Sequence, residues 1–323
     1  MNDRLYVRYA CPRDKTELTC RRDQLCCTLG HRYPIVRGVP VFLLPEAEST
    51  HNAIQDSIAR AQNPDQPFPE DEWHPTSHES VHPAVQKMVS AAGGYLYESL
   101  IGKLRTYPIP EIRLDAGNGR QLLDIGCNWG RWTISAARKG YFVTGMDPDL
   151  GAVFTARRVA EQLGVRARFI VGDARWLPFP NNSFQVAFSY SVLQHFSKSD
   201  AALAFAEIGR VLEHDGKALI QLPNKFGIRS LYHQVRLRSN RSKFRVRYWS
   251  PKEILETFTR LVGPSSLSVD GFFGLGIQAG DINLLPLHLR SVVISSEVLR
   301  RASERVPALK SLADSLYVTT VKP

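Results

Sequence analysis

Short apolar runs alternate with stretches of helical periodicity from about residue 84 onward. The apolar runs predict five strands, at 121–126, 141–146, 167–171, 184–190 and 217–222. Helices are predicted between them, at 132–139, 150–163 and 201–212. Because strands that alternate with helices of about 10–15 residues form right-handed βαβ units, we expect an α/β fold with a parallel sheet and helices on both faces.

The last hundred residues add one helix, two strands and two insertions. Ser250-Pro-Lys-Glu253 predicts a helix start, because serine caps, proline fits the first helical position and glutamate completes a capping box. That helix should run to about Leu261. Two final strands are expected at 267–274 and 315–321, and the insertions lie at about 225–249 and 280–312.

Composition divides the chain into three parts. Residues 1–44 are rich in cysteine and end in a β-like run, so they predict a small β-rich ribbon-like domain. Residues 45–83 carry many Pro, Asp, Glu, Asn, Gln and His residues with little apolar period, which indicates a linker or a surface wrap. Residues 84–323 should form the α/β domain.

The overall numbers exclude several classes of protein. With 323 residues, 43% hydrophobic and 22% charged, the chain is neither wholly disordered, nor a collagen, nor a coiled coil. No apolar run is long enough for a membrane span, and we expect no signal peptide. Five cysteines, an odd number, without an export signal favour a reducing, cytoplasmic location. The net charge of +10 favours anionic partners, such as nucleic acid, anionic lipid or a phosphorylated substrate.

A glycine turn follows the first predicted strand of the α/β domain, in Leu122-Leu-Asp-Ile-Gly-Cys-Asn-Trp-Gly130. Glycine lets a ligand approach the backbone, and the helix that follows presents its positive dipole end. The turn departs from the dinucleotide pattern Gly-x-Gly-x-x-Gly, because Asn128 and Trp129 fill the places where small residues would admit a phosphate. Asp124 would repel phosphate but can hold a cationic amino group.

Two more acids follow the next two predicted strands. Asp147 ends the second strand, where an acid accepts hydrogen bonds from ribose hydroxyls, and Asp173 follows the third, where it could meet the edge of an adenine ring. Ligands of open α/β sheets bind at the carboxyl ends of the strands, where all three acids are expected. The ligand should therefore carry a ribose, an adenine and a cationic amino-acid part, without a pyrophosphate.

These motifs together resemble the class I S-adenosylmethionine-dependent methyltransferases: Asp124-x-Gly126-x-x-x-Gly130, Asp147 and Val171-Gly-Asp-Ala174. The resemblance covers roughly residues 90–323. It implies a Rossmann-like, mostly parallel sheet of seven strands whose last strand is antiparallel. A generic Rossmann-like protein with incidental acids is the alternative.

The resemblance also implies roles for individual residues. Asp124 and the backbone of Gly126, Cys127, Asn128, Trp129 and Gly130 would contact the methionine moiety of S-adenosylmethionine. Asp147 would bind the ribose, Asp173 and Ala174 the adenine, and Tyr190 would line the cofactor pocket. Trp129 could instead pack on the sheet. Cys127 is a small filler residue rather than a nucleophile, because nothing near it in sequence would activate it.

Methyl transfer from a sulfonium needs an aligned acceptor, and a base only where the acceptor holds a proton. His195, after the fourth strand, is a candidate base and could equally be a structural residue that caps the helix or packs beneath the cofactor. The sequence has no Asn-Pro-Pro-Tyr or Asp-Pro-Pro-Tyr after that strand and no paired catalytic cysteines. Methylation of an adenine or glutamine amino group, or of a base carbon, is thus not indicated.

The cysteine-rich segment resembles the zinc-ribbon-like domain that activates several tRNA and protein methyltransferases, and the zinc segment of bacterial ribosomal-RNA guanine methyltransferases. Cys11, Asp14, Cys27 and His31 could supply the four ligands that zinc requires. Cys20 and Cys26 are alternatives. Asp14 stands where those ribbons have a cysteine, and such ribbons can also keep their fold without metal.

The first insertion carries eight basic residues and no acid: Lys225, Arg229, Arg236, Arg238, Arg241, Lys243, Arg245 and Arg247. It could be a lid over an anionic or membrane-associated substrate, a contact to RNA phosphates, or a solvated loop. The second insertion carries an apolar helical face: Leu284, Leu285, Leu287, Leu289, Val292, Val293, Val298 and Leu299. That face could cover a hydrophobic acceptor, touch a membrane surface, pack on the body or dimerise.

The sequence therefore favours a methyltransferase that acts on a small or lipid-linked acceptor, at oxygen or nitrogen. An RNA methyltransferase that docks rRNA or tRNA through the ribbon and the basic insertion is the alternative. A binding module with a relic cofactor site is a third class, which the intact acids argue against. The pattern leaves the acceptor atom and the oligomeric state open.

Overall fold

A computed structural model describes residues 8–47, 52–64, 67, 81–237, 246–274, 276 and 278–323. Among the helices of these residues, none combines the length and the apolar character that crossing a membrane requires. The basic residues Arg238, Arg241, Lys243 and Arg245 of the first insertion lie outside the described part.

The described α/β domain is built on a seven-stranded sheet in the order β10-β11-β9-β8-β5-β6-β7. The bounds are β5 Gln121–Ile125, β6 Phe142–Asp147, β7 Arg168–Val171, β8 Phe184–Ser189, β9 Leu212–Pro223, β10 Ser265–Gly271 and β11 Ser315–Val321. β9, β8, β5, β6 and β7 pair in parallel, and β11 pairs antiparallel with both β9 and β10. The expected Rossmann-like sheet with an antiparallel last strand is thus confirmed.

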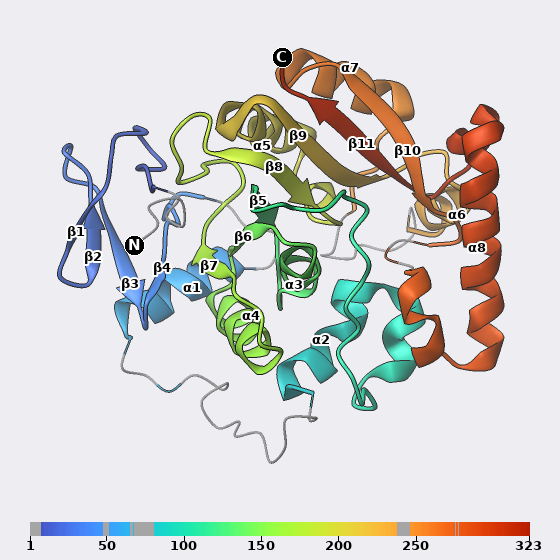
Figure 1. Cartoon of the computed structure of the whole chain (residues 1–323), viewed down its shortest axis with the longest axis horizontal. Helices are drawn as coiled ribbons and strands as arrows, with labels where there is room; N and C mark the ends of the chain where they lie inside the picture. Colours follow the sequence, from blue (N-terminus) through green and yellow to red (C-terminus); the bar gives the residue numbers. More distant parts are fainter. Residues whose placement is uncertain are drawn as a thin grey trace.

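Helices cover both faces of the sheet. α5 (Lys198–Val211) and α7 (Pro251–Leu261) lie on one face, and α3 (Arg131–Arg138) and α4 (Leu150–Gln162) lie on the other (Figure 1). The predicted capping box of α7 is present, with Ser250 accepting from the Glu253 backbone and Glu253 accepting from the Ser250 backbone. Element bounds shift by a few residues, and β9 starts directly after α5, where a loop was expected.

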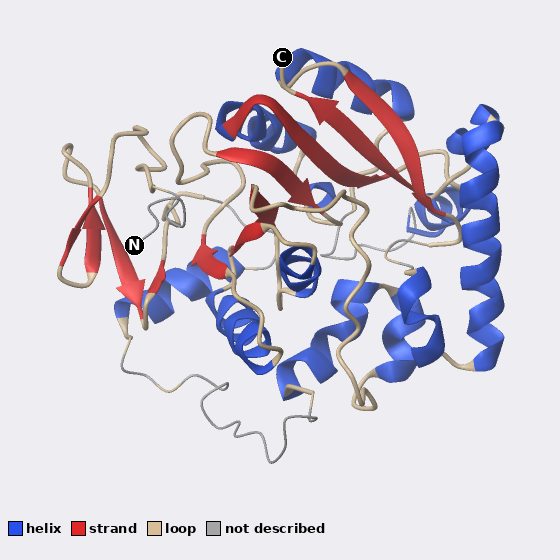
Figure 2. Ribbon diagram, in the orientation of Figure 1, coloured by secondary structure: helices blue, strands red, loops and turns tan. Residues whose placement is uncertain are grey.

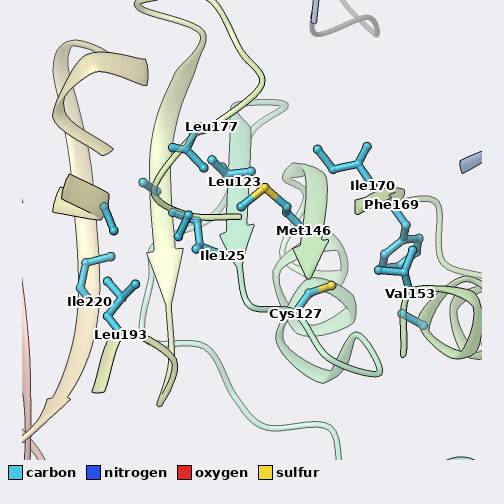
Figure 3. Close-up of a cluster of buried hydrophobic side chains, with 14 of the residues drawn as sticks. Leu123, Ile125, Cys127, Met146, Val153, Phe169, Ile170, Leu177, Leu193 and Ile220 are labelled. Carbon is cyan, nitrogen blue, oxygen red and sulfur yellow. The ribbon is translucent and has the colours of Figure 1, made fainter. Parts of the chain in front are cut away.

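The largest cluster of buried apolar side chains includes those that β5, β6 and β7 contribute, among them Leu123, Ile125, Met146 and Ile170, each 1% exposed or less (Figure 3). A second cluster contains aromatic side chains of α3, β8 and β11, including Trp132, Phe188 and Tyr317. Together they hold the carboxyl ends of the parallel strands in fixed positions, where ligands bind in open α/β sheets.

The cysteine-rich segment forms a separate small antiparallel sheet, in the order β1-β2-β3-β4 (Figure 2). Its strands are β1 Thr19–Arg21, β2 Gln24–Cys26, β3 Arg32–Val36 and β4 Val39–Pro40. The chain after β4 reaches β7, where the Phe42 N–H donates to the Val171 carbonyl at 2.8 Å. An ion pair between Lys15 and Glu207 at 2.7 Å joins the same segment to α5.

The segment 45–83, expected to be a linker or a surface wrap, contains helix α1 (Ala53–Gln62), which the sequence pattern did not predict. α1 packs against α4. The Ser57 hydroxyl donates to the Pro148 carbonyl at 2.8 Å and accepts from the Leu150 N–H at 2.9 Å. The described part of this segment is therefore docked on the body, and Ile54 and Ala61 are buried there. Helix α2 (Pro83–Gly93) and the 3-10 helix η3 (Tyr95–Leu100) follow it.

Both insertions contain helices. The first contains α6 (Ile228–Leu237), and the second contains η5 (Ala279–Leu284), α8 (Leu287–Arg305) and η6 (Pro307–Ser311). The predicted apolar face of 280–312 is only partly correct, because Leu285 and Val293 are buried whereas Leu287 and Val298 are 79% and 60% exposed. α8 contacts β10 at the edge of the sheet, where its buried positions form a narrow stripe.

Candidate active site

The glycine turn between β5 and α3 packs closely against neighbouring residues. Gly126 and Gly130 have φ of 78° and 85°, and Asn128 between them also has a positive φ. A Cβ on Gly126 would lie 2.1 Å from Cγ2 of Val192, which follows β8. Only glycine therefore fits at this position, both for its backbone conformation and for the space it leaves.

Asp124 lies inside the sheet at the carboxyl end of β5. Its Oδ2 accepts a hydrogen bond of 2.6 Å from the Thr133 hydroxyl of α3. Burial raises the pKa of Asp124 to about 7, the Thr133 hydrogen bond works in the opposite direction, and the nearby charge of Asp147 raises it further. The carboxylate thus connects the strand to the helix that the turn opens.

Asp147 ends β6, the neighbouring strand. Its Oδ2 accepts from the backbone N–H of Asn128 at 2.9 Å, and its Oδ1 accepts from the N–H of Asp149 at 3.0 Å. Burial raises its pKa to about 7 against these two hydrogen bonds. The structure therefore brings Asp124, Asp147 and the glycine turn together, as the sequence predicts.

Within the described residues, neither Asp124 nor Asp147 has an ion-pair partner. Burying an ionised carboxylate without a cation costs free energy, which is why both pKa values are raised. A ligand that brings an ammonium group and hydroxyl donors to this edge would offset that cost. The two acids and the turn therefore fit the methionine and ribose parts of S-adenosylmethionine.

The adenine candidates lie after β7, and one of them already has a partner. The carboxylate of Asp173 accepts from Arg175 Nη2 at 2.7 Å and from Nε at 3.1 Å. The Arg175 guanidinium also lies over the rings of Trp176 and Phe196, at 4.7 and 5.1 Å. Arg175 therefore binds both oxygens of the Asp173 carboxylate in this structure. Ala174 is buried beside it.

Tyr190 and His195 both follow β8. The Tyr190 hydroxyl donates to Asp270 Oδ2 at 2.7 Å and accepts from Gln278 at 2.9 Å, and its ring lies 4.6 Å from that of Trp132. The hydroxyl is therefore bound by β10 and by Gln278, which directly precedes η5. His195 is half-buried at the end of η4 (Leu193–His195), and its carbonyl accepts from the Arg247 side chain at 2.6 Å.

Trp129 and Cys127 of the turn are both buried. Trp129 is fully buried in the main core, with its ring 6.0 Å from that of Tyr107, which agrees with the packing interpretation. Cys127 is 2% exposed, and burial raises the pKa of its thiol well above the usual value. A thiol held neutral is a poor nucleophile, so the filler interpretation fits this environment.

A buried polar cluster beside the turn was not predicted from the sequence. Arg131, the first residue of α3, is 3.5 Å from Asp281 of η5 and stacks over the ring of Tyr97 of η3. The Tyr97 hydroxyl also donates to Asp281. The signal that could have found this cluster is Arg131 itself, a charged residue directly after the second glycine of the turn.

A second group of polar side chains missed by the sequence analysis lies at the ends of β8 and β9. Gln221 Oε1 accepts from the N–H of Ser191 at 2.9 Å and lies 3.0 Å from its hydroxyl. Among the described residues, Gln221 Nε2 and Gln194 Oε1 are buried without a hydrogen-bond partner. Such atoms are costly unless a ligand or water satisfies them, so they are candidate ligand contacts at these strand ends.

The four predicted metal ligands converge. The ligand atoms of Cys11, Asp14, Cys27 and His31 all lie within 4.8 Å of one another. His31 Nδ1 is 3.4 Å from each of the two sulfurs and 2.9 Å from Asp14 Oδ2. The thiol of Cys20 instead donates to the Arg22 carbonyl at the exposed end of the ribbon.

A protein-family model matches the part of the chain that carries the candidate site. Residues 122–216 match a family model described as a methyltransferase domain. This range begins in β5 and ends in β9, so it includes the glycine turn, the three acids, Tyr190 and His195. The match supports the resemblance found from the sequence.

Several curated proteins match about a third of the chain. Over 107 residues the chain is 29% identical to a ubiquinone biosynthesis O-methyltransferase of Azorhizobium caulinodans, covering 33% of this chain and 42% of that one. A malonyl-[acyl-carrier protein] O-methyltransferase of Serratia marcescens is 34% identical over 101 residues, covering 31% and 37%. The chain thus spans about two fifths of the length of the curated relatives it matches.

Solved structures of other proteins align with about two thirds of this chain. A SAM-dependent methyltransferase of Methanosarcina mazei aligns with a TM-score of 0.49 at 18% identity, covering 68% of this chain and 99% of that one. The YcgJ protein of Bacillus subtilis aligns with a TM-score of 0.44 at 22% identity, covering 65% and 94%.

Proposed function

We propose that this chain, whose residues 122–216 match a methyltransferase domain, transfers a methyl group from S-adenosylmethionine to a small or lipid-linked acceptor. The observation that carries the proposal is the pair of buried carboxylates, Asp124 and Asp147, at the ends of adjacent parallel strands around the glycine turn. Their raised pKa values are what two acids without a bound cation should show.

S-Adenosylmethionine supplies an already activated methyl group, which leaves the sulfonium by in-line displacement. The backbone of the glycine turn would hold the methionine part, and Asp124 would face its ammonium group. Asp147 would accept hydrogen bonds from the ribose hydroxyls. Asp173 would use the acceptor capacity that Arg175 leaves on its carboxylate for the adenine.

The acceptor would lie over the ends of β8 and β9. Gln194 and Gln221 offer an acceptor and a donor atom there that need partners, and His195 is the nearby base for an acceptor that holds a proton. Transfer to oxygen or nitrogen is what this chemistry suits. Two relatives are named as O-methyltransferases, which supports oxygen as the first choice.

We also propose that the ribbon holds a zinc ion. A tetrahedral zinc with bonds of about 2.0–2.3 Å separates its ligand atoms by about 3.3–3.7 Å. Of the six separations between the ligand atoms of Cys11, Asp14, Cys27 and His31, three are 3.4 Å. A shift of a few tenths of an ångström would fit a fourth, His31 Nδ1 to Asp14 Oδ2, and the other two are no longer than 4.8 Å. Two thiolates, an imidazole and a carboxylate form a donor set that suits zinc.

The test of the function is a labelling experiment. Purified protein and methyl-labelled S-adenosylmethionine are added to a lysate of cells that lack the gene, and the lysate is divided into organic-extractable, nuclease-sensitive and small polar fractions. Label in the organic or small polar fraction supports the proposal. Label lost on ribonuclease treatment would replace it by the RNA methyltransferase alternative. The Asp147→Ala variant serves as the control, since it should label nothing.

A further inference from the structure

Helix α6 exposes apolar side chains in a regular pattern. Leu231, Tyr232 and Val235 lie three, four and seven residues after Ile228, so these four side chains share one side of the helix. Each of them, and Phe226 just before the helix, is between 45% and 70% exposed. A helix of a globular protein normally turns such a stripe toward the core.

The opposite side of α6 explains this orientation, because polar contacts hold it to the body. Ser230 is buried, and its N–H donates to Asp314 Oδ1 at 2.8 Å. A Cβ on Gly227 would lie 2.5 Å from the Asp314 Cα, so the chain before the helix is pressed against the same residue. The apolar stripe therefore faces outward in the docked position of the helix.

A neighbouring segment extends the apolar surface. The Ile228 N–H donates to the Leu312 carbonyl at 3.2 Å, and the Leu312 side chain is 47% exposed. We define the α6 patch as Phe226, Ile228, Leu231, Tyr232, Val235 and Leu312.

The charges around the α6 patch are all of one sign along the helix. Lys225 and Arg236 are exposed at its two ends, and Arg229 lies between them. The sequence holds no acid from Lys225 to Arg247. Asp314, which binds the buried side of the helix, is 1% exposed. Apolar side chains flanked by lysine and arginine are the pattern of a helix that lies in the surface of an anionic membrane.

The α6 patch is connected to the acceptor side of the candidate site. α6 begins four residues after Asn224, at the carboxyl end of β9, and the Lys225 N–H donates to the Trp249 carbonyl at 2.8 Å. Arg247, which ends the same insertion, donates through its N–H to the Gln194 carbonyl and through its side chain to the His195 carbonyl. The insertion therefore spans from the α6 patch to the loop that carries the candidate base.

We propose that the α6 patch docks on the surface of an anionic phospholipid bilayer, with its apolar side chains at the acyl boundary and Lys225 and Arg236 on the headgroups. Docking would place the acceptor side near the membrane, where a lipid-linked acceptor resides. This last consequence rests on the proposed function, whereas docking itself does not.

The experiment is flotation of the full chain with vesicles of phosphatidylcholine, with or without about one third phosphatidylglycerol. The chain should float with the anionic vesicles, and added salt should weaken the binding. The double variant Leu231→Ser/Val235→Ser should lower the partition coefficient at least about tenfold, and Lys225→Gln/Arg236→Gln should remove most of the dependence on anionic lipid. Leu203→Ser, at an apolar residue of α5 that is 51% exposed, is the matched control and should change nothing.

Failure to float with anionic vesicles, or equal flotation of the Leu231→Ser/Val235→Ser variant, would overturn the proposal. Sedimentation of the same variants identifies a second copy as the occupant if a wild-type dimer becomes a monomer, and a filter-binding assay with total RNA identifies RNA. Calorimetry with S-adenosylhomocysteine separates this proposal from the proposed function. The α6 variants should bind it as the wild type does, and Asp147→Ala should float normally without binding it.

Discussion

The carboxylate of Asp147 lies 2.9 Å from the backbone nitrogen of Asn128, so the end of β6 holds the turn that follows β5. The same carboxylate accepts from the N–H of Asp149 at the start of α4. One buried acid thus fixes the relative positions of two neighbouring strand ends. Its remaining acceptor capacity is available to hydroxyl donors of a ligand.

The charge of Asp147 should contribute to ligand binding. Asp147→Asn keeps an oxygen that accepts from Asn128 but removes the buried charge. We expect it to lower the affinity for S-adenosylhomocysteine at least about tenfold, since hydrogen bonds to charged groups contribute about 1.5–3 kcal/mol. Calorimetry measures the affinity. Asp149→Asn is the matched control, because asparagine caps a helix as well as aspartate does, and unchanged affinity in Asp147→Asn would contradict the site assignment.

The two raised pKa values predict a pH dependence of stability without ligand. The folded-state pKa of Asp147 is about 7, above its ordinary value of 3.8, so the folded state holds a proton that the unfolded state has lost. The free energy of unfolding should therefore fall between about pH 4 and 7, by about 1.4 kcal/mol for each pKa unit, and then level off. Urea unfolding at pH 5.5 and pH 8 measures this slope. This pH dependence should differ between the wild type and Asp147→Asn. Equal pH dependence in both would show that Asp147 is ionised over the whole range from pH 5.5 to pH 8.

Gly126 should not tolerate a side chain. Gly126→Ala would place its Cβ 2.1 Å from Cγ2 of Val192 at a backbone φ of 78°. We expect a loss of about 1–3 kcal/mol in the free energy of unfolding from the clash, plus a contribution from the φ strain. In Gly126→Ala/Val192→Ala the contacts with both Cγ atoms are removed, whereas the contact with the Val192 Cβ at 2.9 Å and the strain stay. In urea unfolding, Gly126→Ala should therefore cost less in the Val192→Ala background than in the wild type. Full additivity of the two substitutions would mean that Val192 does not limit the space there.

The cluster of Tyr97, Arg131 and Asp281 should contribute to stability. Tyr97→Phe removes the donor to a buried carboxylate, and we expect it to lower the free energy of unfolding by about 1–3 kcal/mol. Tyr232→Phe, whose side chain is exposed, should cost less than about 0.5 kcal/mol. If thermal unfolding finds the two variants equally stable, the Tyr97 hydroxyl contributes nothing.

The ribbon should bind one zinc ion through the predicted residues. Cys27→Ser should lower the zinc content measured by mass spectrometry, because its sulfur lies 3.4 Å from both His31 Nδ1 and Asp14 Oδ2. Cys20→Ser should leave it unchanged, since that thiol lies outside the cluster. A wild-type protein that stays free of zinc after incubation with the metal would rule the site out.

Local patterns in the sequence predicted the elements that position the site. Apolar runs such as 121–126 and the capping box at Ser250 are formed by residues that are close in sequence, so the sequence pattern alone predicts them. The metal cluster was also predictable, because Cys11, Asp14, Cys27 and His31 keep a short spacing in a known arrangement. The position of each acid at a strand end follows from the same patterns.

Contacts between distant segments could not be predicted in this way. Tyr97 and Asp281 are 184 residues apart, and neither belongs to a motif. Arg175, two residues after Asp173, was overlooked because the resemblance assigned the acid to a ligand. Helix α1 has only two apolar side chains larger than alanine, Ile54 and Ile58, so its pattern is weak. The apolar face predicted for α8 is wider than the buried one, because periodicity does not show how much of a face a neighbouring element will cover.

The contact between Phe42 and Val171 has a consequence for truncation experiments. β7 is the last strand of the large sheet, and an unpaired outer strand offers a free row of backbone donors and acceptors to other chains. The residues that follow β4 occupy part of that row, through the Phe42 N–H and the parallel bridge between Val41 and Val171. Removing residues 1–44 would leave this row open to intermolecular pairing. A shortened chain should therefore aggregate even where its α/β domain, residues 84–323, is intact.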